Sequence, residues 1–185
     1  RLDSDILSGW IKSEIDGYVS DQPLPTYRKL TCILMADFTG PFGSGLRNAT
    51  IPRTHVPDNY RDALLNAYCS QGVAEIEAIL SRNGQRMTVR LSVDAAITPL
   101  FHDNVYDGMV CLSLWKEVGS SEFVKILDTV RTRALDVVLE LEKLNPKAAD
   151  VRDLIDKIGR QRLDGVINQT IFSTGPANIA GSVSG

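Results

Sequence analysis

The sequence of 185 residues has few of the residues from which most active sites are built, with only two histidines and three cysteines. Cys32, Cys69 and Cys111 are far apart and odd in number, and each lies in an apolar run. They have neither the close spacing of a zinc or redox motif nor the even number of a secreted disulfide framework. We therefore expect three buried, reduced thiols, no metal, no cofactor and a cytoplasmic location.

The sequence also lacks an excess of basic residues and a long apolar run. Its 20 Lys and Arg against 23 Asp and Glu give a net charge of -3 at pH 7, whereas a protein that binds nucleic acid usually has a basic face. The net charge therefore disfavours nucleic acid as a partner. No apolar run approaches the roughly twenty residues that span a bilayer, so we expect no membrane contact.

No motif in the chain specifies a reaction. The glycine-rich stretch GPFGSG, residues 40–45, is followed by proline-containing sequence rather than by a helix, so it is interpreted as a turn and not as a phosphate loop. His102, Asp103 and Asp107 lie close together and have the chemistry to bind a metal or to act in acid–base catalysis, but a solvated loop explains them more simply. The motifs leave enzymatic activity undecided.

Hydrophobic periodicity predicts an α+β fold, in which a small mixed or antiparallel sheet packs with several helices. Strands are expected at residues 30–38, 86–93 and 109–118, with a poorer edge or loop candidate at 46–57 because of its prolines. Helices are expected at residues 2–18, 58–82 with a break at Gly72, 121–144 and 148–163. The long amphipathic helix at 121–144 is expected to form the spine of the domain.

The domain is expected to cover residues 1–165, followed by a Gly-, Ser- and Asn-rich tail at 166–185. The tail has no charged residue after Asp164. It suits a flexible linker, with or without an edge strand at its start, or else the beginning of a β-rich assembly segment.

The opening helix and the turn after it contain an unusual group of polar and aromatic residues. Trp10, Glu14 and Tyr18 are four residues apart and share one stripe of the helix. A carboxylate between two aromatic rings needs a partner, and Arg28, just beyond Pro23 and Pro25, is placed to fold back onto Glu14. We interpret the group as architecture, with a ligand site as the alternative.

Two arginines on the long helix form a second candidate site. Arg131 and Arg133 flank Thr132, and each has a carboxylate three residues away, Asp128 and Asp136 respectively. A salt-bridged polar face explains this pattern. A contact with an anion or with a partner is the alternative.

The segment WIKSEIDGY, a short spacer and LPTYR together resemble the signature of the AbiTii-like abortive-infection domain of bacterial phage defence. Later stretches fit the same family in order: IPRTHVP, GVAEIEAIL and ILDTVRTRALDVVLELEKLNP. The resemblance covers most of the chain, and it implies that further helices precede Arg1. In the opening signature, Ile15 replaces the usual leucine and eight positions match: Trp10, Glu14, Gly17, Tyr18, Leu24, Pro25, Tyr27 and Arg28.

The resemblance implies a role in antiphage defence but supplies no reaction. We expect a non-enzymatic sensor or interaction module that recognises a protein partner or a phage component. Self-association is a further expectation because the long helix is broadly apolar. The alternative is an enzyme or toxin that acts on nucleic acid or a nucleotide, using Glu14, Arg28, Arg131 and Arg133.

Overall fold

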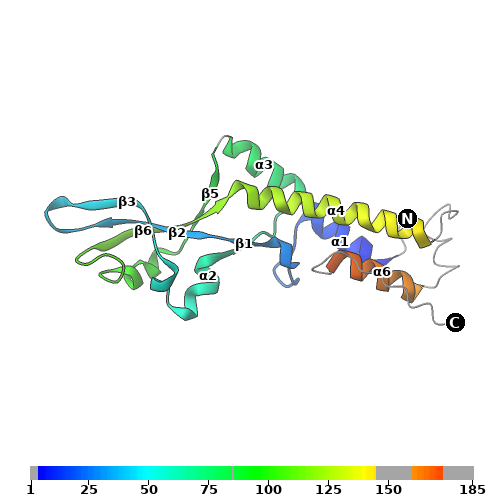
Figure 1. The fold of residues 1–185 in the computed structure, drawn as a ribbon, viewed down its shortest axis with the longest axis horizontal. Helices are drawn as coiled ribbons and strands as arrows, with labels where there is room; N and C mark the ends of the chain where they lie inside the picture. Colours follow the sequence, from blue (N-terminus) through cyan, green and yellow to red (C-terminus); the bar gives the residue numbers. More distant parts are fainter. Residues whose placement is uncertain (1–3, 85, 145–159, 173–185) are drawn as a thin grey trace. The chain divides into compact units, whose positions relative to one another are not determined.

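The computed structural model describes residues 4–84, 86–144 and 160–172 (Figure 1). The chain divides into two compact units, each built from segments that are distant in the sequence. Unit 1 comprises Arg1–Thr26, Ser70–Glu75 and Ile126–Gly185, and unit 2 comprises Tyr27–Cys69 and Ile76–Lys125. The chain therefore leaves unit 1 and returns to it twice.

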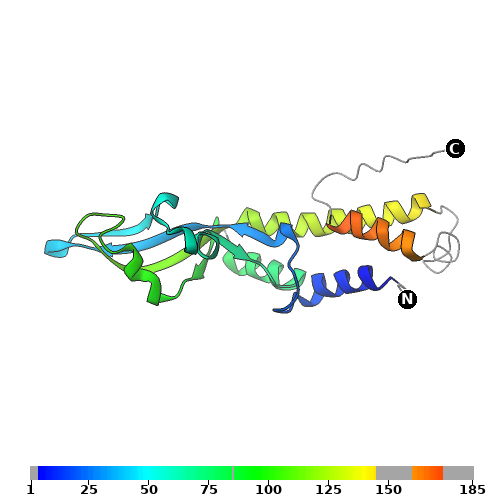
Figure 2. The same ribbon diagram turned by 90° about the horizontal axis from the view of Figure 1, so that it is seen from below.

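The described part of unit 1 is mainly helical. It contains α1 (Asp5–Asp16), α6 (Arg160–Phe172) and most of α4 (Ser120–Leu144), which run alongside one another (Figure 2). Their apolar stripes meet because leucine, isoleucine and valine recur at helical spacing on each. The buried cluster consists of Leu7, Trp10, Val137, Leu163, Ile167 and Ile171.

Both ends of α1 are fixed by local chemistry. Ser4 caps the N-terminus: its Oγ accepts the N–H of Leu7 and donates to Asp164 on α6 at 2.8 Å. Gly17 ends the helix with φ of 91°, and a side chain there would lie 2.8 Å from the Ser70 carbonyl oxygen. Glycine at this position therefore both stops the helix and lets another segment of unit 1 approach.

Unit 2 is built on two antiparallel sheets (Figure 1). The larger has the order β3-β2-β6-β5, and β1 pairs with β4 in the smaller one. The strands are β1 (Lys29–Thr31), β2 (Ile33–Thr39), β3 (Gly45–Thr50), β4 (Asn66–Tyr68), β5 (Thr88–Ser92) and β6 (Val110–Gly119). The helices of the connecting segments are α2 (Arg61–Leu65) and α3 (Val73–Asn83), of which α3 begins in unit 1.

One face of the larger sheet carries the core of unit 2. Alternate residues of β2 are buried there, and the ring of Phe38 packs edge-on against Tyr106 with the centroids 5.0 Å apart. A 3-10 segment, Ala95–Phe101, contributes the fully buried Phe101. The other short 3-10 turns are Thr26–Arg28, Pro41–Gly43, Arg53–His55 and Asp58–Tyr60.

The α+β architecture and its main elements agree with the sequence analysis. The elements α1, β2, β5, β6 and α4 lie where periodicity predicted them, and β3 is an edge strand.

The three cysteines are free and buried, as expected, and burial raises the pKa of the Cys32 and Cys111 thiols. Most of the helix expected at 148–163 lies outside the described residues. Among the described helices, none is both long and apolar enough to cross a membrane.

The helix expected over residues 58–82 with a break at Gly72 was wrong in its middle part, although α3 begins at Val73, directly after the expected break. The helix α2 ends at Leu65, and the next residues form β4. The ammonium group of Lys116, on β6, donates to the carbonyl oxygens of Ala63 at 3.0 Å and Asn66 at 2.9 Å. These tertiary hydrogen bonds satisfy the carbonyl groups at the end of α2 and outweigh the local helical tendency.

The edge strand that the sequence allowed at the start of the tail was also wrong for residues 166–172, because these residues belong to α6.

Substitution of Gly72 by alanine should destabilise the protein. The Cβ of an alanine would overlap the backbone carbonyl of Ile15, which cannot move away as a flexible side chain would. We expect Gly72→Ala to lower the free energy of unfolding by about 2–3 kcal/mol, measured by urea denaturation.

Gly165 provides a matched control within α6. A Cβ there meets nothing within 4 Å, so Gly165→Ala should raise the free energy of unfolding by about 0.5–1 kcal/mol through helix propensity. Equal stability of the two alanine variants would contradict the close approach of Gly72 to α1.

Candidate functional site

Trp10 and Glu14 are buried in unit 1, and Tyr18, which contacts Glu14, is half-buried. Trp10 is 6% exposed and Glu14 is 3% exposed. The Tyr18 hydroxyl donates to Glu14 Oε1 at 2.6 Å, and the Tyr18 N–H donates to the Ser70 carbonyl oxygen at 2.8 Å. A buried carboxylate held in this way links α1 to the segment that follows it. The geometry supports a structural role for these residues.

Arg28 is fully buried in unit 2. Its Nη1 donates to the Cys69 carbonyl oxygen at 3.0 Å, and the Cys69 N–H donates to the Arg28 carbonyl oxygen at 2.9 Å. Pro25 is buried and Tyr27 is half-buried. Because Arg28 and Glu14 belong to different units, their pairing stays a prediction. A side chain as inaccessible as Arg28 is better suited to support the fold than to bind a ligand.

Arg131 and Arg133 lie on the unit 1 part of α4. Arg131 is 66% exposed, and its Nη1 lies 3.3 Å from Asp128 Oδ1 in a pair of the expected spacing. Arg133 is half-buried. A surface pair of this kind contributes little to stability. Anion or partner binding by the two arginines stays a prediction.

His102, Asp103 and Asp107 lie in the loop before β6. The His102 Nε2 is 3.2 Å from the Cys111 carbonyl oxygen, while Asp103 and Asp107 are exposed. In the ranges 4–84, 86–144 and 160–172, no three His, Cys, Asp or Glu side chains are grouped so that they could hold a metal ion.

A polar concave site lies in unit 2 and was not anticipated from the sequence. It is a cavity of about 670 Å³ between β1, the end of β3 and α2. Apolar residues such as Ile51 and Leu65 line part of it. The charged lining residues are three cations and two carboxylates: Lys29, Arg53, Arg61, Asp58 and Asp62.

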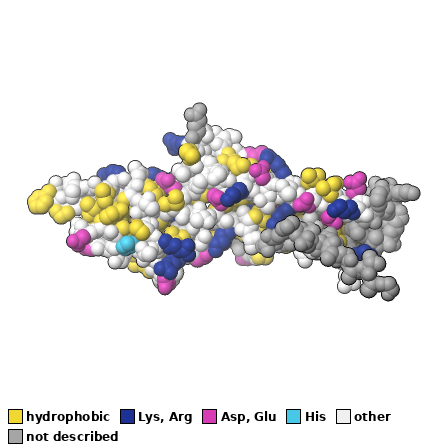
Figure 3. Space-filling model, in the orientation of Figure 1, with side chains coloured by type: hydrophobic (Ala, Val, Ile, Leu, Met, Phe, Trp, Pro, Cys, Tyr) yellow, Lys and Arg dark blue, Asp and Glu magenta, His cyan; other side chains and the backbone are white. Residues whose placement is uncertain are grey.

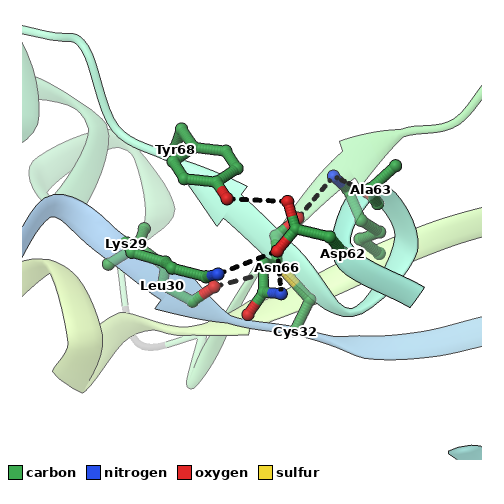
Figure 4. Close-up of polar contacts among 8 residues, drawn as sticks. Lys29, Leu30, Cys32, Asp62, Ala63, Asn66 and Tyr68 are labelled. Atoms are coloured by element: carbon green, nitrogen blue, oxygen red, sulfur yellow. Dashed lines mark hydrogen bonds and ion pairs between the residues drawn. The ribbon is translucent and has the colours of Figure 1, made fainter. Parts of the chain in front are cut away.

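Asp62 is the hub of the polar contacts at one side of this cavity (Figure 4). Its Oδ1 accepts from Lys29 Nζ at 2.8 Å and from Asn66 Nδ2 at 3.0 Å, and its Oδ2 accepts from the Tyr68 hydroxyl at 2.8 Å. The Lys29 ammonium and then the Tyr68 hydroxyl hold the pKa of the Asp62 carboxyl below its ordinary value. Contacts of Lys29 with Asp62 and then with Tyr68 raise the pKa of Lys29. The network joins β1, α2 and β4.

The cationic side chains around the cavity differ in the number of ion pairs and hydrogen bonds that they make. Arg61 pairs with Asp58 and also donates from Nε to the Val56 carbonyl oxygen at 3.2 Å. Among the described residues, the exposed Arg53 side chain has no ion pair or hydrogen bond. Figure 3 shows Lys and Arg side chains gathered at the surface beside α2. The lining can therefore attract an anionic group.

The second exposed site is the apolar end of the larger sheet, which we define as Phe42, Leu46, Val110 and Leu112. Phe42 is fully exposed at the tip of the β2–β3 hairpin, and the other three are 37%, 42% and 52% exposed. Figure 3 shows hydrophobic side chains at this end of the sheet. Exposed apolar side chains of this kind are typical of protein-contact surfaces.

The hairpin that carries Phe42 is held by Asp37. The carboxylate of Asp37 accepts the N–H of Asn48 at 2.9 Å and pairs with Arg47 at 3.1 Å, and these contacts hold its pKa below the ordinary value. Phe42 and Asn48 both have positive φ, 57° and 51°. Phe42 therefore occupies a backbone conformation that is unfavourable for phenylalanine, and its exposed ring gains no stabilisation from burial.

The pKa of Asp62 should depend on Lys29. In an NMR titration, Lys29→Met should raise the pKa of the Asp62 carboxyl toward its ordinary value of 3.8, because the largest hydrogen-bonding contribution is lost. Since the folded pKa lies below the unfolded one, the contribution to stability is present above the unfolded pKa and is lost as the pH falls through the folded pKa. Lys125→Met, which removes an exposed pair elsewhere in unit 2, is the control and should leave Asp62 unchanged.

Comparison with known proteins identifies a family. The AbiTii family model matches residues 1–156, which is most of the chain. Neither a curated protein nor a solved structure matches the chain. The match includes the opening segment, both sides of the cavity and the apolar end of the sheet. The chain belongs to the AbiTii family, an abortive-infection family of antiphage defence.

Proposed function

We propose that the chain acts in antiphage defence as a non-enzymatic interaction module, and that the apolar end of the sheet binds a protein partner. The observation that carries the proposal is Phe42. Its ring is wholly exposed at a hairpin tip, in a backbone conformation that favours glycine. Folding gains little from a phenylalanine there, so its contribution is better explained by a partner that buries the ring.

The surroundings of Phe42 indicate the chemistry of that partner. The loop before β6 lies against the hairpin: a side chain at Gly40 would lie 3.3 Å from the Met109 side chain, and the Asp103 N–H donates to the Met109 carbonyl oxygen. This loop brings the exposed carboxylates of Asp103 and Asp107 to the same end of the sheet. An apolar protein segment flanked by Lys or Arg, from a phage or from the host, would complement it.

Replacement of Phe42 should abolish protection without destabilising the protein. In cells that express Phe42→Ser, we expect phage plaquing to rise at least about tenfold over the wild type, while accumulation and thermal stability stay within the range of surface substitutions. Met87→Ser is the matched control, because Met87 is 85% exposed elsewhere in unit 2. Full protection by Phe42→Ser and by the double variant with Leu112→Ser would refute the proposed surface.

A second candidate function, binding or chemistry on a nucleotide or nucleic acid, is favoured by the cationic lining of the cavity. Calorimetric titration with ATP and with a single-stranded oligonucleotide tests it. This candidate predicts binding that is lost in Arg53→Ala and kept in Arg82→Ala, which removes an exposed arginine outside the cavity. The absence of binding at roughly millimolar ligand, a level typical of weak sites, would eliminate it.

A further inference from the structure

An exposed seam runs along the unit 1 part of α4, on the side away from the buried cluster. Asp128, Arg131, Leu135, Val138 and Glu142 alternate at spacings of four and three residues, which is the spacing of a coiled-coil seam. Val137, which faces the core, is 4% exposed, whereas Leu135 and Val138 are 58% and 59% exposed and the adjoining Leu139 is 42% exposed. Figure 3 shows hydrophobic side chains at the surface along α4.

We propose that this seam binds a second copy of the chain, with the two α4 helices antiparallel. The argument rests on the order of charges along the seam. Its apolar centre lies between a cation, Arg131, and an anion, Glu142. When two copies run in opposite directions about a point near Val137, Leu135 of each faces Val138 and Leu139 of the other. The Arg131 of each copy then faces the Glu142 of the other, which gives two ion pairs related by symmetry.

The same charges disfavour the parallel arrangement. Parallel helices in register would place Arg131 against Arg131 and Glu142 against Glu142, and like charges in such positions are destabilising. The Asp128 that pairs with Arg131 within one copy can remain bound, because a guanidinium group has five donors. The seam from Arg131 to Glu142 spans about 16 Å of helix, so the interface is small and the association should be in the micromolar range.

Unit 2 is not needed for this contact, so the proposal does not depend on the partner proposed for the apolar end of the sheet. Arg131, predicted from the sequence as an anion or partner contact, gains a specific role as a pairing residue. The seam therefore binds the same segment of a second copy, with its helix in the antiparallel direction.

Sedimentation equilibrium of the whole chain tests the apolar centre of the seam. The wild type should dimerise reversibly, and Leu135→Glu should weaken the dimer at least about a hundredfold by placing two carboxylates at its centre. Met87→Glu, at an exposed apolar residue of unit 2 outside both proposed sites, is the matched control and should dimerise like the wild type. Circular dichroism checks that all three remain folded. A wild type that stays monomeric at about 100 µM would overturn the proposal and leave the seam to another protein or another segment.

Charge reversal tests the direction of the helices. Arg131→Glu and Glu142→Arg should each weaken self-association by about tenfold or more, because each variant repeats one sign at both ends of the seam. An equimolar mixture of the two should form a heterodimer as tight as the wild-type dimer, because every reversed charge then meets its opposite. Single reversals that leave the wild-type affinity unchanged, or a mixture that stays monomeric, would overturn the antiparallel pairing.

Discussion

The pair of hydrogen bonds between Arg28 and Cys69 is the interaction on which the smaller sheet and the polar network beside it depend. It closes the β1–β4 ladder at one end, with the guanidinium of Arg28 fully buried against the carbonyl oxygen of Cys69. The adjoining residues Lys29 and Tyr68 are thereby brought together, so that both can bind Asp62. The cavity and its polar network thus follow from a bond that is itself inaccessible. The chain also passes between the two units within two residues of this pair, at 26–27 and at 69–70.

Local patterns predicted the elements whose stability is mainly local. The helix α1 has a serine cap, an apolar stripe and a terminal glycine, and α4 has a long helical period, so both were found from the sequence. The end of α2 was not, because the group that satisfies its carbonyls is Lys116, about fifty residues further along the chain. No pattern within residues 58–82 contains that information. Tertiary contacts therefore decided this part of the fold.

The candidate sites also differ in how far local sequence patterns could predict them. The residue types of Trp10, Glu14 and Arg28 made the opening segment a candidate site, yet burial makes these three side chains better suited to stabilise the fold than to bind a ligand. The cavity was missed because its lining comes from separate segments, each with an ordinary composition. One signal was available: Arg53 belongs to the IPRTHVP stretch and Lys29 directly follows LPTYR, so two family motifs converge on it. The exposure of Phe42 could not be predicted, because GPFGSG predicts a turn but not where the ring points.

The division of unit 1 among distant segments has a consequence for its synthesis. Its buried cluster joins Leu7 and Trp10 of α1 to Val137 of α4 and to Leu163, Ile167 and Ile171 of α6, so α1 lacks most of its buried apolar partners until α6 leaves the ribosome. Contacts of such high sequence separation form late and make folding slow. A chain interrupted during translation therefore cannot assemble unit 1. The protein gains its helical unit only when nearly all of the described sequence has been translated.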